Sequence, residues 1–196
     1  MNDPATSAPG LGRPEEARAF LERNPDIEAV QLVITDANGV GRGKNIAREE
    51  LDALYGPGRN VAGSILGLDV TGEDVEETGL VWSVGDADQC CRPVAGSLAR
   101  ATWLARPTAQ VLGTMFELDG QPARADPRHV LAQVVNRLQS HGLTPVVAVE
   151  LEFYLLQREA DGRLQPARGL LSGARSARID AYGFGRLDDM SPLFDD

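Results

Sequence analysis

The alternation of apolar and polar positions predicts a β-hairpin in the first quarter of the chain. Val30, Leu32 and Ile34 alternate with Gln31, Val33 and Thr35, the period expected of a strand with one buried face. The sequence Asp-Ala-Asn-Gly at 36–39 is typical of a tight turn, and VGRGKNI after it reads as the returning strand.

Further short elements are predicted around this hairpin. Helices are expected at 14–24, where Pro stands in the first turn, and at 47–55, before the breaker Gly56-Pro57-Gly58. Strand candidates follow at 79–84, 101–105 and 110–118. Mixed strands and helices favour a small α+β domain that ends near residue 118, preceded by a disordered tail of about a dozen residues.

The clearest predicted helix begins after Asp126. This residue can cap the helix, Pro127 suits its first turn, and His141-Gly142 is a usual ending. One apolar face is formed by Val130, Leu131, Val134, Val135 and Leu138. We interpret this helix as the beginning of a second domain.

The segment VVAVELEFYLL, residues 146–156, reads as a buried strand that carries Glu150 and Glu152. Side chains two positions apart point to the same side of a strand, so the two carboxylates should lie together. The opposite side is expected to face the helix at 127–141, through Val149, Leu151 and Phe153.

Three interpretations of this glutamate pair remain open from the residues alone. Hard divalent cations favour oxygen ligands, so the pair could bind a metal ion. The carboxylates could instead be exposed acids on a solvated sheet face, or partners in a structural ion pair.

The last part of the chain contains a turn and a helix-start pattern. Asp161-Gly162 predicts a turn that leads into a return strand or loop. Residues 191–196, SPLFDD, resemble the first turn of a helix, with a Ser cap and an early Pro. We therefore expect the chain to be cut inside a domain; a frayed tail is the alternative.

Charge and cysteine content narrow the classes of partner and compartment. Lys and Arg number 19 against 29 Asp and Glu, and the resulting charge of −10 argues against non-specific binding to nucleic acid or anionic membranes. Cys90 and Cys91 are adjacent, which disfavours an ordinary disulfide and suggests reduced thiols in a cytoplasmic protein. No signal peptide or membrane-spanning run is recognisable.

An ordered series of motifs resembles the glutamine synthetase superfamily. VAVELEFYLL is similar to the strand that opens its catalytic domain, and VQLVITDANGVGRGKNI is similar to its N-terminal β-grasp hairpin. GSILGLDVTG resembles a segment of the γ-glutamylpolyamine synthetase-like branch. DADQCCRPV, the Trp103 region and LDGQPARADPRHVL match in order, so that the resemblance covers roughly residues 26–196.

This resemblance implies a fold and a reaction. The fold would be α+β: a tail and short helix at 1–24, a β-grasp domain at 25–118, and the incomplete start of a catalytic α/β domain at 119–196. The family reaction uses ATP to phosphorylate the γ-carboxylate of glutamate, and ammonia or an amine then attacks the acyl phosphate. The resemblance also implies Glu150 and Glu152 as ligands of Mg²⁺ or Mn²⁺, which offset charge during phosphoryl transfer. Stacked rings of subunits, hence a homo-oligomer, are implied as well.

One position departs from the family pattern. Glutamine synthetases proper carry an Asp before Gly-Ser, which helps to bind and deprotonate ammonium, whereas this chain has Ala62. The departure favours a larger amine, such as a polyamine, over ammonia. Lys44 lies in Gly-Arg-Gly-Lys, but this is not a Walker loop, and we interpret Lys44 as structural or exposed.

Most of the family's active site has no counterpart in these residues. The further Glu and His ligands, the nucleotide- and phosphate-binding arginines and the flap glutamate would lie beyond Asp196; His129 and His141 belong to the predicted helix. We therefore expect the isolated chain to be inactive, with no catalytic residue assigned. The alternatives are a glutamine synthetase proper that uses ammonia, and a non-catalytic β-grasp interaction module.

Overall fold

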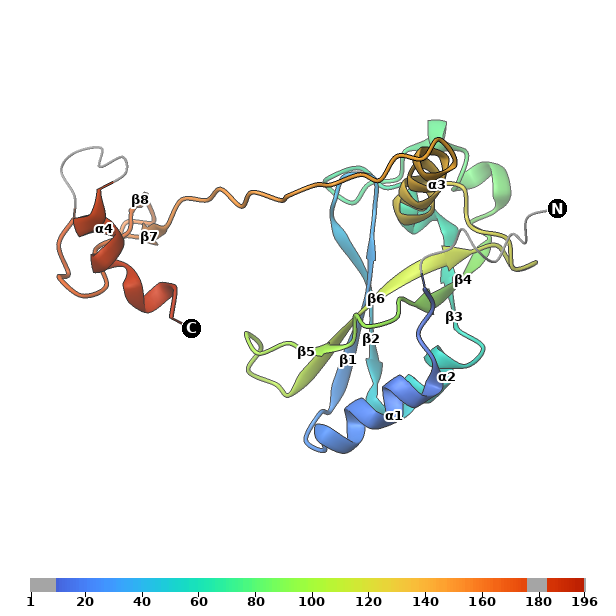
Figure 1. The fold of residues 1–196 in the computed structure, drawn as a ribbon, viewed down its shortest axis with the longest axis horizontal. Coiled ribbons are helices and arrows are strands. Elements are labelled where there is room, and N and C mark those ends of the chain that lie inside the picture. The colour runs from blue at the N-terminus through green and yellow to red at the C-terminus, as the bar shows by residue number, and fades with distance from the viewer. Residues whose placement is uncertain (1–9, 176–182, 196) are drawn as a thin grey trace. The chain divides into compact units, whose positions relative to one another are not determined.

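The computed structural model describes residues 10–175 and 183–195, and the chain forms two compact units, residues 1–145 and 146–196 (Figure 1). The predicted disordered tail falls largely on residues 1–9, which lie outside the described residues. Its last part is ordered, contrary to prediction. Leu11 forms a bridge with Val94, and the Gly12 amide donates to the Pro93 carbonyl at 2.8 Å.

A mixed, six-stranded sheet forms the centre of unit 1. Its strands are β1 Ala29–Thr35, β2 Gly41–Ala47, β3 Arg59–Ala62, β4 Asp88–Pro93, β5 Ala99–Arg100 and β6 Thr108–Phe116. The order is β2-β1-β6-β4-β3, and β5 also pairs with β6. The β1–β6 pair is parallel, with Val30 opposite Ala109, and the other pairs are antiparallel.

Short helices complete the core of unit 1. Helix α1 (Pro14–Arg23) and helix α2 (Leu51–Tyr55, after a 3₁₀ turn at Arg48–Glu50) contribute Phe20, Leu51 and Leu54. These side chains pack in one cluster with residues from the central strands, among them Val30, Leu32, Ile34, Val111 and Met115. Both helices were predicted, and the α+β class is confirmed.

The predicted hairpin is also confirmed. Strands β1 and β2 pair along their whole length, from Ala29–Ala47 to Thr35–Gly41. Val30, Leu32 and Ile34 are buried, as their alternation predicted, because this side of β1 faces the core. In the turn, Gly39 has a φ of +77°, a conformation that glycine adopts at little cost.

In unit 1, two predicted strands are absent, and three observed strands, β3, β4 and the two-residue β5, were not predicted. Residues 82–84 form a 3₁₀ turn with Trp82 73% exposed, and residues 101–105 form turns after the short β5. Neither segment has a neighbouring strand with which its backbone could form sheet hydrogen bonds among the described residues. By contrast, β3 has only four residues and β4 reads DQCCRP, so neither has a clear period of two. They are strands because β3 pairs with β4 and β4 pairs with β6.

Helix α3 (Pro127–Ser140) begins and ends as predicted. The Asp126 side chain accepts a hydrogen bond from the Arg128 amide at 2.8 Å, and Gly142 follows the helix with a φ of +73°. Its apolar face is exposed, however: Val130, Leu131 and Val134 are 48%, 64% and 51% exposed. Among the described residues, no helix is long and apolar enough to cross a membrane.

Unit 2 is small and has its own hairpin. Strands β7 (Leu156–Arg158) and β8 (Leu164–Pro166) are antiparallel, and the predicted Asp161-Gly162 turn joins them. Helix α4 (Phe184–Asp189) follows later in the chain. The expected helix start at 191–196 forms a 3₁₀ turn at Ser191–Leu193, whereas Asp196 lies outside the described residues.

Candidate functional site

The segment that carries Glu150 and Glu152 is extended but is not a strand. The prediction of a buried strand at 146–156 is therefore wrong for all but its last residue, where β7 begins. Val149, Leu151 and Phe153, expected on a buried side, are 84%, 83% and 64% exposed.

The physical reason is the lack of a partner strand. Among the described residues, the backbone of 144–154 makes no hydrogen bond, and the first bond links the Leu155 carbonyl to the Ala167 amide at 2.8 Å. Alternating and apolar side chains make a segment suitable for a β-sheet. The backbone hydrogen bonds of a sheet, however, require a neighbouring strand. None pairs with this segment in the part of the chain that is described.

The carboxylates of Glu150 and Glu152 are the type of ligand that a hard cation prefers, but two ligands are too few for a complete site. Both are exposed, and residues two apart on an extended backbone can point to one side. Mg²⁺ prefers six oxygen ligands and Ca²⁺ six to eight, so two carboxylates leave most positions to water. Among the described residues, no group of three or more His, Cys, Asp or Glu side chains could hold a metal.

Both histidines belong to α3 and its C-terminal cap, in unit 1. His129 is buried in α3, where its Nε2 donates to the Met115 carbonyl at 2.8 Å and lies 3.1 Å from Thr114 Oγ1. His141 caps the C-terminus of α3 and is exposed. His129 therefore anchors the helix to β6, a structural role.

An apolar cavity of about 880 Å³ adjoins the glutamate segment within unit 2. Phe153 and Tyr154, which directly follow Glu152, line it together with Phe184, Leu187 and Met190. Met190 is buried, whereas many other apolar side chains of unit 2 are exposed.

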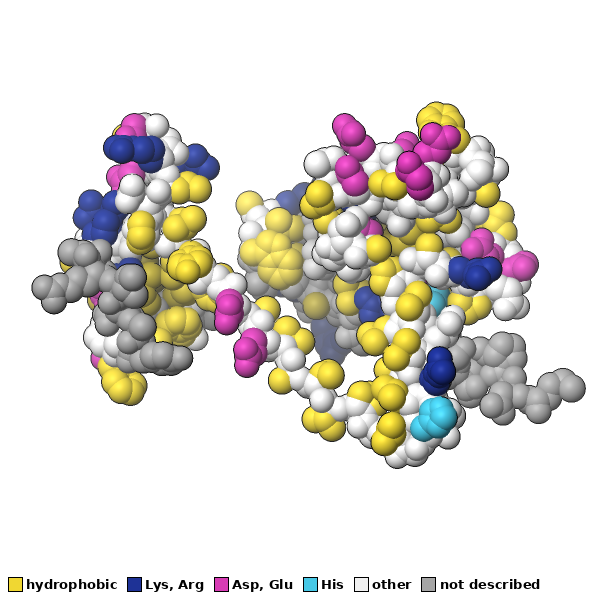
Figure 2. Space-filling view, turned by 90° about the horizontal axis from the view of Figure 1, so that it is seen from above, with side chains coloured by type: hydrophobic (Ala, Val, Ile, Leu, Met, Phe, Trp, Pro, Cys, Tyr) yellow, Lys and Arg dark blue, Asp and Glu magenta, His cyan; other side chains and the backbone are white. Residues whose placement is uncertain are grey.

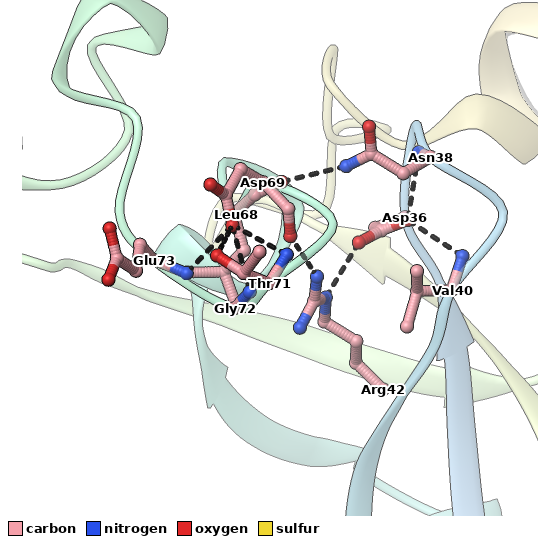
Figure 3. A network of polar contacts seen from close by, with 9 residues as sticks. All are labelled: Asp36, Asn38, Val40, Arg42, Leu68, Asp69, Thr71, Gly72 and Glu73. Carbon is pink, nitrogen blue, oxygen red and sulfur yellow. Dashed lines mark hydrogen bonds and ion pairs between the residues drawn. The ribbon is translucent and has the colours of Figure 1, made fainter. Parts of the chain in front are cut away.

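In unit 1, a polar network ties the hairpin turn to the loop after β3 (Figure 3). Asp36 is 2% exposed and accepts from the Asn38 amide at 2.8 Å, the Val40 amide at 2.9 Å and Arg42 Nε at 2.6 Å. Arg42 also donates to the Asp69 carbonyl. The Arg42 side chain thus joins a buried carboxylate to the 68–73 loop.

That loop is closed by its own aspartate. Asp69 Oδ1 accepts from the Thr71 hydroxyl at 2.7 Å and from the amides of Thr71, Gly72 and Glu73 at 2.8–3.0 Å. The hydrogen bond from the Thr71 hydroxyl is the main reason that the pKa of Asp69 lies below its usual value. This network was not predicted, although Asp36 at the start of a turn that contains Asn38-Gly39 is a known signal for such side-chain hydrogen bonds.

The remaining candidates are exposed or inert. Lys44 is exposed on β2, as expected. Cys90 and Cys91 are free thiols, and burial, with smaller effects of Asp126 and Cys90, raises the pKa of Cys91 to about 12. A thiol with such a pKa is protonated at neutral pH and is a poor nucleophile. Ala62 ends β3 opposite Asp88, and the Gly63 amide donates to the Ala87 carbonyl at 3.0 Å.

The family model, the similar sequences and the similar structures all point to glutamine synthetases and related ligases. A model of the glutamine synthetase catalytic domain matches residues 124–196. The chain is 38% identical to gamma-glutamylputrescine synthetase PuuA of Escherichia coli K12, over 93% of this chain and 39% of that protein. It is 32% identical to gamma-glutamylethanolamide synthetase GlnA4 of Streptomyces coelicolor, over 95% of this chain and 40% of that protein.

The chain therefore spans about two fifths of the length of these two relatives. Among solved structures, the cryo-EM structure of Plasmodium falciparum glutamine synthetase is similar with a TM-score of 0.50 and 15% identity. That match covers 69% of this chain and 24% of the other, and at this identity it shows the fold alone.

Proposed function

Because this chain belongs to the glutamine synthetase superfamily, within its γ-glutamylpolyamine synthetase-like branch, we propose that it is the N-terminal part of an ATP-dependent glutamate–amine ligase. The reaction would pass through γ-glutamyl phosphate. The observation that carries this proposal is the 38% identity to a γ-glutamylputrescine synthetase over 93% of the chain.

The acceptor in this proposal is a small amine or polyamine and not ammonia. Both relatives named above join glutamate to an amine according to their names, putrescine in one and ethanolamine in the other. Ala62 supports the choice, because the family resemblance expects a carboxylate there in enzymes that capture ammonium. A methyl group cannot accept a proton or pair with a cation.

Glu150 and Glu152 are the proposed metal ligands. Carboxylate oxygens suit Mg²⁺ or Mn²⁺, and both side chains are free of burial and accessible to an ion. Since two carboxylates are too few for a complete site, the other ligands would come from the rest of the longer protein. Such ions would neutralise phosphate charge when bound with ATP.

The domain division stays as proposed, with a β-grasp domain at 25–118 and the start of a catalytic domain at 119–196. A parallel β1–β6 pair flanked by antiparallel strands, with α1 and α2 packed in the same core, supports the β-grasp assignment. A homo-oligomer is supported by the exposed Trp82 and Trp103, since aromatic side chains are enriched at interfaces. Two free cysteines support a cytoplasmic location.

The isolated chain is proposed to be inactive. Two carboxylates cannot bind ATP, orient the amine and stabilise a phosphoryl-transfer transition state without further groups. The purified 196-residue chain should release no ADP above background with glutamate and putrescine, in an assay coupled to ADP release. Clear turnover by the chain alone would refute this part of the proposal.

The ligase activity itself is tested on the longer protein. The DNA downstream of the Asp196 codon should encode a continuation with the missing His, Glu and Arg residues. That protein should release ADP with glutamate and putrescine or ethanolamine, and much more slowly with ammonium. Absence of any such continuation would favour the non-catalytic interaction module instead.

A further inference from the structure

The β7–β8 hairpin has a polar face with a pocket of about 450 Å³. Gln157 pairs with Gln165, and the Glu159 amide donates to the Arg163 carbonyl at 2.9 Å one step nearer the turn. Because side chains alternate along a strand, these four residues share one side of the hairpin. The pocket lining includes Gln165, two acids (Glu159 and Asp161) and three arginines (Arg163, Arg168 and Arg175).

A closed loop after β8 brings two of these arginines together. The Gly169 amide donates to the Ala174 carbonyl at 2.8 Å, and the Gly173 amide donates to the Gly169 carbonyl at 2.9 Å. Residues 169 and 174 are the immediate neighbours of Arg168 and Arg175. The hydrogen bond between residues 169 and 174 therefore places Arg168 and Arg175 on adjacent stretches of backbone.

The arginines in the pocket have more hydrogen-bond donors than their acidic neighbours can use. Arg163 binds Asp161 at 2.7 Å and Arg175 binds Glu159. Arg168 is exposed and makes one long hydrogen bond, of 3.4 Å, to a carbonyl among the described residues. Arg175 Nε is buried without an acceptor in that same part of the chain. Each guanidinium has five donors.

The local charge is unusual for this chain. Three arginines against two carboxylates leave the pocket lining with a net charge of +1, in a chain whose net charge is −10. Figure 2 shows dark blue Lys and Arg side chains gathered on part of unit 2, with Asp and Glu among them. The net positive charge of this lining favours an anion.

We propose that this arginine pocket, formed by Arg163, Arg168 and Arg175 with Gln165, binds a small phosphate-class anion. Guanidinium forks match the geometry of phosphate oxygens, and the several acceptor oxygens of a phosphate suit a pocket with spare donors. The Gln165 amide adds a neutral donor. The inference goes beyond the proposed ligase activity and does not depend on it, because it concerns residues other than the glutamate pair.

The test is calorimetric titration of the full 196-residue chain with pyrophosphate, at low salt and with EDTA to exclude binding through divalent ions. Saturable binding is expected, and R168Q should weaken it about tenfold through the loss of one charged fork. R168K keeps the charge but loses the fork, so an intermediate affinity is expected. Circular dichroism checks that each variant folds like the wild type.

Two controls separate a local site from general charge attraction. R137Q removes an exposed arginine from α3 in unit 1, changes the net charge equally, and should leave the affinity within about twofold, since Arg137 is not part of the pocket lining. Citrate, a carboxylate whose charge near neutral pH is similar to that of pyrophosphate, should bind more weakly than pyrophosphate. ATP without metal should also bind, through its phosphates. If ATP binds more tightly than pyrophosphate, the ligand is a nucleotide. If the two affinities are equal, the ligand is a free phosphate.

Three results would overturn the proposal. They are no saturable binding of pyrophosphate, equal losses in R168Q and R137Q, and tighter binding of citrate than of pyrophosphate. Each of these results would mean that the arginines of this pocket only stabilise the hairpin, through their ion pairs with Glu159 and Asp161.

Discussion

Asp36 is a buried carboxylate whose hydrogen bonds determine how it responds to pH. Burial alone would raise its pKa, but hydrogen bonds from Arg42, Val40 and Asn38 outweigh burial and hold the pKa below the usual value. A depressed pKa in the folded state stabilises the fold above the pKa of the unfolded chain. That contribution is lost as the pH falls through the folded pKa.

We therefore expect the free energy of unfolding to fall as the pH drops below about 4. Asp36→Asn should lower stability at pH 7 by about 3 kcal/mol, because it leaves a partly buried Arg42 without its anion. The variant should lose less stability than the wild type on acidification. Urea denaturation at pH 7 and pH 3 measures the stability of the wild type and the variant. The control is Asp52→Asn at an exposed position, which should change the free energy of unfolding by less than about 1 kcal/mol.

The glutamate pair predicts weak metal binding by this chain. Among the described residues, no third His, Cys, Asp or Glu side chain joins the two exposed carboxylates in a possible metal site. The dissociation constant for Mg²⁺ or Mn²⁺ should therefore exceed about 1 mM. Glu150→Gln/Glu152→Gln should abolish what binding there is. Titration followed by Mn²⁺ paramagnetic resonance measures it, and micromolar, ordered binding would contradict the expectation.

At the scale of elements, α3 is held by its first turn and not by its apolar face. The Asp126 carboxylate accepts from the Met115 amide and the Thr114 hydroxyl, both at 2.7 Å, besides capping the helix. Asp126→Ala should therefore cost about 3 kcal/mol of unfolding free energy, from the lost cap and an unpaired buried amide.

By contrast, Leu131→Glu on the exposed face should change stability by less than about 0.5 kcal/mol. Urea denaturation followed by tryptophan fluorescence measures both α3 variants. A large loss in Leu131→Glu would mean that the apolar face of α3 is covered in solution.

The unpaired segment 146–154 is an expected site of proteolysis. Its backbone lacks hydrogen bonds to the described residues, and Phe153 and Tyr154 are 64% and 91% exposed. Chymotrypsin should cut after these two residues before it cuts after Trp82 or Trp103, which lie in turns. Mass spectrometry of early products checks this, and initial cleavage at either tryptophan would refute it.

At the scale of the whole molecule, the sequence predicted those features that local interactions determine. The β1–β2 hairpin and α3 were predictable because turn residues, caps and periodicity act within a few positions. Strand β4 was not, because DQCCRP becomes a strand only between β3 and β6. For the candidate site, the sequence identified Glu150 and Glu152 but not their surroundings, since ladder formation and metal coordination both depend on distant partners.

The parallel pairing of β1 with β6 also determines when unit 1 can fold. Val30 meets Ala109 across 79 residues of sequence, so the central pair of the sheet closes a long loop before its contacts form. Pairings of such high contact order fold slowly. During synthesis, the apolar side of β1 must therefore wait, exposed, until β6 has left the ribosome. Any chain that ends before Phe116 should remain unfolded and be a substrate for chaperones.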